Sequence, residues 1–195
     1  MSGYAKPPSY PTPEQRSVRG LGSPLAQIKA IPDGYDGTAA VVAAMQALAL
    51  ASYADERVNR LAREITEALP RRDYMAEAAA VLRYFQTQFR YTRLPWNPQG
   101  LQRLQTPSET LFDAPVRSGE CASLSTAMAA VLMSLGFEVM FRTAGVDKSN
   151  PKFFEHVYCE IAVPDVGWLA ADPSYERELG WEHPAGVVQQ DWSLT

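Results

Sequence analysis

Apolar positions in the first half of the chain recur at the spacing of helices. An alanine-rich segment from Thr38 to Ala54 predicts a first helix, with Thr38 as its cap. Two further apolar stripes predict a second helix that ends at Pro70 and a third that is capped by Asp73. Such stripes are typical of core-forming helices, so we assign no chemistry to them. Their members are Val58, Leu61, Ala62, Ile65 and Leu69, then Met75, Ala78, Leu82, Phe85 and Phe89.

The second half of the chain predicts one more helix and then short strands. Apolar residues between Cys121 and Leu135 lie on one helical face, and Gly136 stands where helices commonly stop. Three later segments show the patterns of strands, and the Pro164-Asp165 pair predicts a turn between the last two. These strands are 137–142, 156–162 and 167–172. We therefore expect an α+β fold, with N-terminal helices followed by a helix packed on a small antiparallel sheet.

Two proline-rich stretches fall outside this pattern. Residues 1–33 hold six of the fifteen prolines and predict an extended N-terminal arm, followed by a single domain over residues 34–195. The arm is either a disordered leader or a segment that docks on a neighbouring subunit, and the sequence leaves both open. Residues 93–116 hold four prolines and predict a long ordered loop. Loops of that length in compact domains are often functional.

Composition narrows the possible chemistry. The 195 residues carry a net charge of −4 without a block of Lys or Arg, which argues against nucleic acid as the main ligand. Two Cys and two His offer no disulfide framework or zinc spacing, so we expect no metal or cofactor. The apolar segment Thr38 to Ala54 is short for a membrane span, and the polar start of the chain does not resemble a secretory signal. These observations leave the cellular compartment of the protein open.

Cys121 is the first residue that points to chemistry. It follows Ser118-Gly119-Glu120 and opens a predicted helix, whose positive end and free N–H groups favour a thiolate. A thiolate is the form in which cysteine acts as a nucleophile. The alternative is a small buried apolar cysteine, which is the commoner fate of this residue.

His156 and Asp172 complete a candidate set with Cys121. In the strand from His156, alternation places His156 and Tyr158 on one face and Cys159, as a core residue, on the other. If residues 163–167 form the turn, Asp172 lies opposite Tyr158 and on the face of His156. A carboxylate there can orient the imidazole. The alternatives are a structural histidine at a sheet surface and a turn-forming Asp ahead of Pro173.

Three stretches resemble the transglutaminase-like superfamily, which belongs to the broad papain-like group of cysteine enzymes. They are SGECASLSTAMAAVLMSLGF, EHVYCEI and GWLAADPSY, and the likeness extends over residues 34–182. The family pattern is a Gly-x-Cys that opens a helix, a His-x-aromatic-x-Glu strand and a Gly-Trp…Asp-Pro strand. The stretches GYDGTAAVVAAM, YFQTQFRYTR and LQTPSETL are further similar to transglutaminase-like proteins encoded by tailed bacteriophages.

The resemblance implies roles for the three candidate residues. Cys121 would be the nucleophile, His156 the general base and acid, and Asp172 the orienting carboxylate. Family members often carry acidic residues just after the cysteine, where this chain has Ala122 and Ser123. That departure leaves the substrate preference open.

The function implied is that of a cysteine hydrolase or acyltransferase acting on peptide or isopeptide bonds. We expect hydrolysis rather than cross-linking, because nothing in the sequence marks a dedicated amine site. The phage resemblance implies a virion-associated peptidase, with a cell-wall peptide or a virion protein as substrate. The alternative is a structural virion or assembly subunit that keeps the fold as a docking module and contacts neighbouring subunits through its N-terminal arm.

Several further residues are candidates for supporting roles. The backbone N–H of Cys121 is a natural half of an oxyanion hole. Gln105, in the long loop, is the first candidate for the second donor, with Gln102 and Trp96 behind it; the alternative is ordinary loop packing. Aromatic residues that would line a substrate groove are Trp96, Tyr158 and Trp168. Aromatic side chains are more often core or subunit contacts.

Overall fold

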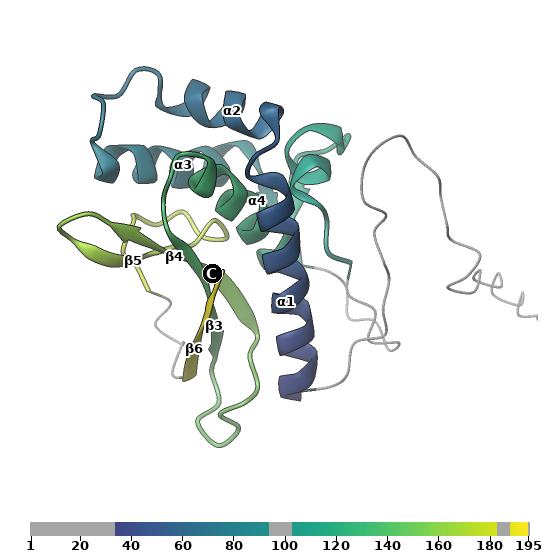
Figure 1. Ribbon diagram of the computed structural model, residues 1–195. Coiled ribbons are helices and arrows are strands. Elements are labelled where there is room, and N and C mark those ends of the chain that lie inside the picture. Colours follow the sequence, from purple (N-terminus) through teal and green to yellow (C-terminus); the bar gives the residue numbers. More distant parts are fainter. Residues whose placement is uncertain (1–33, 94–102, 183–187, 195) are drawn as a thin grey trace, which may run out of the picture.

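The helices precede the sheet along the chain, as the sequence predicts (Figure 1). The computed structural model describes residues 34–93, 103–182 and 188–194. The predicted arm at residues 1–33 lies outside the described residues, as do Trp96, Gln102 and His183. The α+β class is confirmed: helices come first, and a small antiparallel sheet follows.

Three helices form the first half of the described chain, namely α1 (Gly34–Ser52), α2 (Glu56–Thr66) and α3 (Tyr74–Gln88). The Asp73 side chain accepts a hydrogen bond of 3.0 Å from the Ala76 N–H, so the predicted cap of α3 is confirmed. Thr38 is not a cap, because α1 begins four residues earlier and the Thr38 hydroxyl donates to the Gly34 carbonyl. A threonine inside a helix can make this bond, so it does not mark a helix start.

The segment predicted as one long loop contains elements of its own. Its C-terminal part forms η2 (Glu109–Asp113), a short π-helix. Before and after the loop, β1 (Arg90–Tyr91) and β2 (Ser118–Gly119) pair in parallel, with Tyr91 opposite Gly119. This pairing holds the approach to the next helix against the end of α3.

The main sheet has four strands in the order β5-β4-β3-β6, and all neighbours are antiparallel. The strands β3 (Val139–Gly145), β4 (His156–Val163) and β5 (Gly167–Ala171) match the prediction to within three residues at each end. The strand β6 (Val188–Ser193) was not predicted, because its Val-Gln-Gln-Asp-Trp-Ser sequence is mostly polar. It pairs with β3 along one edge of the sheet.

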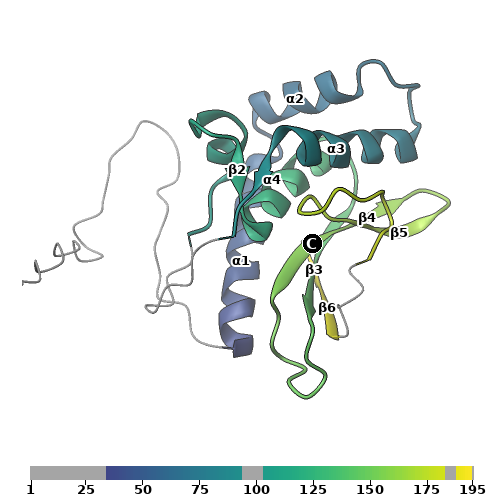
Figure 2. The same ribbon diagram turned by 180° about the vertical axis from the view of Figure 1, so that it is seen from behind.

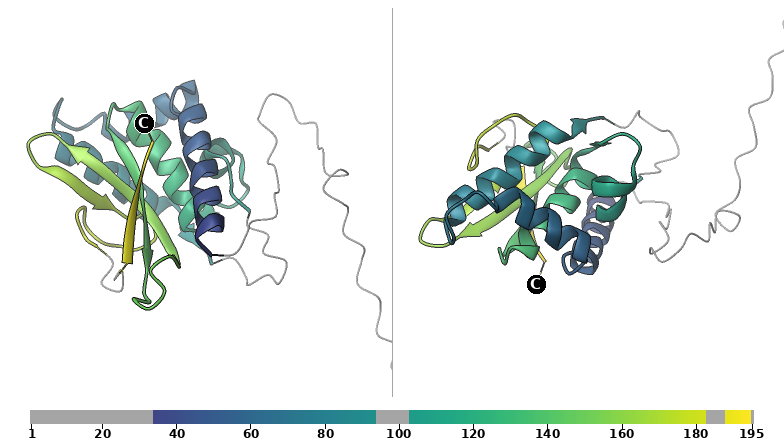
Figure 3. Two further views of the ribbon diagram at one scale, coloured as in Figure 1. Left: turned by 60° about the horizontal axis from the view of Figure 1, so that its bottom comes forward. Right: turned by 90° about the horizontal axis from the view of Figure 1, so that it is seen from above.

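The helix α4 (Cys121–Ser134) is the centre of the fold. Every residue from Ala122 to Leu132 is buried, since the sheet covers one side and the three earlier helices cover the others (Figures 2 and 3). Gly136, with φ of +92°, follows its end as predicted. The Cys159 thiol donates to the Ser125 carbonyl of α4 at 3.3 Å, and Cys159 is fully buried, so its assignment to the core is confirmed.

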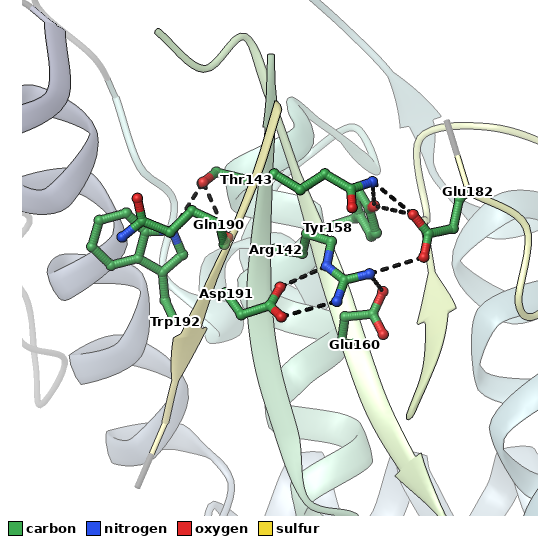
Figure 4. Close-up of polar contacts among 9 residues, drawn as sticks. Arg142, Thr143, Tyr158, Glu160, Glu182, Gln190, Asp191 and Trp192 are labelled. Carbon is green, nitrogen blue, oxygen red and sulfur yellow. Dashed lines mark hydrogen bonds and ion pairs between the residues drawn. The ribbon is translucent and has the colours of Figure 1, made fainter. Parts of the chain in front are cut away.

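The other face of the sheet carries a charge network that runs from a buried carboxylate to exposed ones (Figure 4). The Arg142 guanidinium on β3 makes two hydrogen bonds with Asp191 of β6, at 2.6 and 2.9 Å, and one of 2.9 Å with Glu182. It also lies 2.9 Å from a carboxylate oxygen of Glu160 on β4, which is 2% exposed. Burial raises the pKa of Glu160 to about 7; Arg142 opposes this rise, and Glu182 and Asp191 add to it. These ion pairs join β6 to the centre of the sheet.

Among the described residues, no single helix combines the length and apolar character needed to cross a membrane. Among the described helices, α1 and α2 have the required length and apolar character only when they are counted together, and the chain bends by 84° between them.

The raised pKa of Glu160 predicts how stability changes with pH. The folded protein holds this proton up to about pH 7, whereas the unfolded chain releases it near 4.5. Ionisation of Glu160 therefore costs folding free energy as the pH rises between these values. In Glu160→Gln this loss is absent, so the variant should gain stability relative to the wild type between about pH 5 and about pH 8. Urea unfolding at both pH values measures the difference, and a constant difference would contradict the assignment.

Candidate active site

Cys121 lies at the first position of α4, directly after β2. The Glu120 side chain caps the helix by accepting hydrogen bonds from the Ser123 N–H at 3.3 Å and the Ser123 hydroxyl at 3.2 Å. Its other carboxylate oxygen lies 4.0 Å from the Cys121 sulfur. The sequence pattern did not single out Glu120, since glutamate is not among the usual cap residues. In this chain the acidic residue next to the cysteine is therefore Glu120, before it, instead of a residue just after it.

His156 and Asp172 meet across neighbouring strands. The register pairs Cys159 with Ala171, and its continuation places Asp172 opposite Tyr158, as the sequence predicts. His156 Nε2 lies 2.7 Å from an Asp172 carboxylate oxygen, and the Asp172 side chain is only 2% exposed. The second carboxylate oxygen accepts a hydrogen bond of 2.9 Å from the Ser174 N–H. Asp172 thus both forms the turn ahead of Pro173 and binds the imidazole. The two alternatives that the sequence leaves for this residue are therefore compatible.

The His156 imidazole also contacts the cysteine. Burial disfavours its charged form, but hydrogen bonds with Asp172 and Cys121 outweigh burial and raise the pKa of His156 to about 9. Since Nε2 is occupied by Asp172, the nitrogen available to Cys121 is Nδ1. The site therefore favours a protonated imidazole at neutral pH, held between a carboxylate and a sulfur.

Aromatic side chains lie beside this group, and the sequence analysis did not single out the two tyrosines among them. The Tyr175 ring meets His156 edge-on, with ring centroids 5.6 Å apart, and Trp181 lies 5.6 Å from Tyr175. Tyr91 of β1 lies near the cysteine as well; burial raises its pKa to about 12, and Cys121 contributes to the rise. Both tyrosines are therefore neutral phenols over the physiological range. No spacing in the sequence links them to Cys121.

Gln86 of α3 fixes the segment that carries Tyr175. Its side-chain amide donates to the backbone carbonyls of Tyr175 at 2.6 Å and Arg177 at 2.8 Å, and it lies 3.3 Å from that of Asp172. One half-buried amide therefore holds the turn after β5 against the helical half of the molecule. This contact joins positions 86 residues apart, so local patterns do not reveal it.

A cavity of about 320 Å³ opens beside the sulfur and the imidazole. Cys121 and His156 contribute to its wall, together with Glu120 and Glu155. The opposite wall comes from the first three turns of α1. The α1 residues are Gly34, Gly37, Thr38, Val41, Val42 and Met45. The space that an incoming molecule would use thus lies between α1 and the start of α4.

Of the remaining predicted site residues, one lies near the start of α4 and two do not line the cavity. Gln105 lies close to the start of α4, where its N–H donates to the Ser123 hydroxyl at 3.1 Å. Trp168 lies on β5 and is 42% exposed, outside the cavity wall. Tyr158 is 1% exposed and bonds to Glu182 through its hydroxyl, so it does not line the cavity either. Among the described residues, no group of three His, Cys, Asp or Glu side chains is arranged to hold a metal ion.

The fold and site together define a cysteine–histidine–aspartate arrangement on a helix-and-sheet core. Residues 59–173, more than half of the chain, match the model of the transglutaminase-like superfamily. The chain belongs to the transglutaminase-like superfamily, as the resemblance of its three motifs implies. Its likeness to phage-encoded members stays a prediction. Among curated proteins, none matches this chain.

Solved structures similar to the chain share part of its length. A proposed cysteine protease from Cytophaga hutchinsonii is 16% identical, with a TM-score of 0.46, over 71% of this chain and 46% of the other. The periplasmic domain of TgpA from Pseudomonas aeruginosa is 29% identical over 61% and 44%, with a TM-score of 0.44. LapG from Legionella pneumophila is 17% identical over 70% and 75%, also at 0.44. The chain therefore spans less than half of the first two structures.

The Asp172 contact predicts the titration of His156. In Asp172→Asn the carboxylate charge is lost, so the pKa of His156 should fall from about 9 toward 6.5. NMR of the imidazole C–H resonances measures this shift, with His183, the other histidine of the chain, as internal reference. A pKa of His156 that stays near its wild-type value would contradict the assigned ion pair.

The same shift has a consequence for stability. Because the folded pKa of His156 is raised, its protonation stabilises the fold fully below about pH 6.5, and this contribution disappears as the pH rises through about 9. The wild type should therefore lose its stability advantage over Asp172→Asn across that window. Thermal unfolding at both ends of the window tests the sign.

Proposed function

We propose that the protein is a cysteine hydrolase or acyltransferase that acts on peptide or isopeptide bonds through Cys121, His156 and Asp172. The observation that carries the proposal is the hydrogen-bonded chain from the Cys121 sulfur through the His156 imidazole to the buried Asp172 carboxylate. A helix start favours negative charge on the sulfur, and the imidazolium balances it. Membership of the superfamily supports this class of chemistry.

The first half-reaction is acyl transfer to sulfur. The Cys121 thiolate attacks the carbonyl carbon, and a carbon–sulfur bond forms as the carbonyl oxygen takes up negative charge. When the carbon–nitrogen bond breaks, the His156 imidazolium gives its Nδ1 proton to the leaving amine. The products are a thioester on Cys121 and a free amine.

The second half-reaction restores the enzyme. Neutral His156 takes a proton from water, the oxygen attacks the thioester carbon, and the carbon–sulfur bond breaks to release a carboxylic acid and the thiolate. An amine in place of water would give a new amide. We favour water, because hydrolysis needs no second bound nucleophile. Asp172 keeps the ring orientation and stabilises its charged form in both halves.

The oxyanion needs donors near the start of α4. The Cys121 N–H at the helix start is one, and we propose the Gln105 side chain as the second. Gln105 is held close by its own N–H bond to Ser123, and its side-chain oxygen lies 3.4 Å from the position of a Cβ on Gly119. A pair of fixed donors costs no reorganisation as charge develops.

The likeness to phage-encoded proteins suggests a setting for this chemistry. We propose a virion-associated peptidase whose substrate is a cell-wall peptide or a virion protein. An assembly subunit that kept only the fold would need neither a nucleophile at a helix start nor a buried carboxylate behind the histidine. Reactivity of the cysteine therefore separates the two functions.

The test of the activated cysteine is its alkylation by iodoacetamide as a function of pH, followed by mass spectrometry. Cys121 should react faster in the wild type than in His156→Ala, because the imidazolium stabilises the thiolate that attacks the reagent. Cys159 is the internal control, because burial raises the pKa of its thiol well above the usual value. A Cys121 that reacts like a free thiol with or without His156 would favour the structural alternative.

Turnover tests the proposal directly. Cys121→Ala and His156→Ala should abolish cleavage in a screen of peptide and isopeptide substrates, while circular dichroism remains that of the wild type. Gln105→Ala should lower kcat about 100- to 1,000-fold, the typical loss for one oxyanion donor. Its rate of alkylation should stay unchanged, because alkylation forms no oxyanion. Equal losses in both assays would show that Gln105 acts on the cysteine instead.

A further inference from the structure

The buried hydroxyl of Ser123 lies where two distant segments of the chain meet. Ser123 is the third residue of α4, two positions after Cys121, and it is 1% exposed. Its oxygen accepts a hydrogen bond of 3.1 Å from the backbone N–H of Gln105, in the segment before η2. Its O–H donates to the Glu120 carboxylate at 3.2 Å. A hydroxyl can accept and donate at once, so both bonds form together.

These bonds form a chain that ends beside the sulfur. Because a backbone N–H can only donate, the Ser123 oxygen is the acceptor for Gln105, and its proton is directed at Glu120. The second carboxylate oxygen of Glu120 lies 4.0 Å from the Cys121 sulfur. The chain of bonds therefore connects the Gln105 loop with the start of α4.

The capping of α4 does not account for the bond to Gln105. The cap requires only the Ser123 N–H, which donates to the Glu120 carboxylate at 3.3 Å. The Ser123 hydroxyl makes an additional contact with a residue 18 positions away in the chain. A buried hydroxyl at this position therefore serves more than the helix start itself.

The Gln105 side chain lies on the same side of the site. Its amide oxygen is 3.4 Å from the position of a Cβ on Gly119, which stands two residues before Cys121. An oxyanion donor contributes fully only when it is fixed in advance, and a displacement of about 1 Å can cost about 100-fold in rate. The bond from the Gln105 N–H to Ser123 provides such a restraint.

We propose that Ser123 is a positioning residue whose hydroxyl fixes the Gln105 oxyanion donor relative to Cys121. The inference rests on the proposed function and adds a residue to the machinery of the same site. Ser123 is buried and does not line the cavity beside the sulfur, so it acts through Gln105 and not on the substrate.

The experiment compares two reactions of Cys121 in the full chain. With p-nitrophenyl acetate, the thiolate attacks the ester carbonyl, an oxyanion forms, and p-nitrophenolate leaves an acetyl thioester on the sulfur. Iodoacetamide alkylates the same sulfur without an oxyanion. In Ser123→Ala the acylation rate should fall about 10- to 100-fold, whereas the alkylation rate should stay within about twofold of the wild type. A structural defect at the cysteine would lower both rates alike and would contradict the proposal.

Two further variants locate the effect. In a Gln105→Ala background, Ser123→Ala should lower the acylation rate little further, because the side chain that it positions is already absent. The matched control is Thr126→Val, which also removes a buried hydroxyl from α4, but one that donates to the Ala122 carbonyl within the helix. This control should acylate at the wild-type rate. Losses that multiply in the double variant, or an equal loss in Thr126→Val, would overturn the proposal.

The two proposals fail in different ways. If Ser123 has no positioning role, Ser123→Ala acylates as fast as the wild type, while alkylation of Cys121 still depends on His156. If the proposed function is wrong, that dependence on His156 is absent, and wild-type Cys121 is acylated no faster than a free cysteine. Ser123 then has no reaction to support, and the inference falls with the function.

Discussion

The burial of α4 is the constraint on which the site depends. A helix enclosed by the sheet on one side and by three helices on the others cannot shift along its axis without breaking contacts on every face. Its first residue, Cys121, is therefore fixed relative to β4, which packs on the same helix. The hydroxyl of Ser125 strengthens this link by donating to the Val157 carbonyl at 3.2 Å, next to His156 in the chain. The core thus sets the position of the sulfur relative to the imidazole.

The two faces of the sheet have separate tasks. One face packs on α4 through apolar side chains such as Cys159 and Ile161. The other buries polar groups, where Arg142 joins three carboxylates from other parts of the chain. Arg142 is largely buried and would be costly to leave unpaired, so the network favours one arrangement of strands over shifted ones. It fixes β6 in register with β3 and so completes the edge of the sheet.

Local patterns predicted most of the fold and the centre of the site. The helix-opening Cys121, the alternation around His156 and the short turn before β5 each act within a few residues, and together they give the register that brings Asp172 to the imidazole. The prediction of Thr38 as a helix cap was wrong, because threonine occurs both at helix starts and inside helices. Sequence reasoning also missed β6, whose polar residues find partners only once β3 is beside them.

Contacts between distant segments could not be predicted either, because the partners come together only when the chain is folded. Gln86 binds carbonyls on a turn far along the chain, and its own sequence context is an ordinary helix. The α1 wall has a wider consequence. This helix borders the reactive sulfur but carries none of the three candidate catalytic residues. Substitutions along it could therefore change which molecules reach Cys121 while the residues that carry the chemistry stay the same.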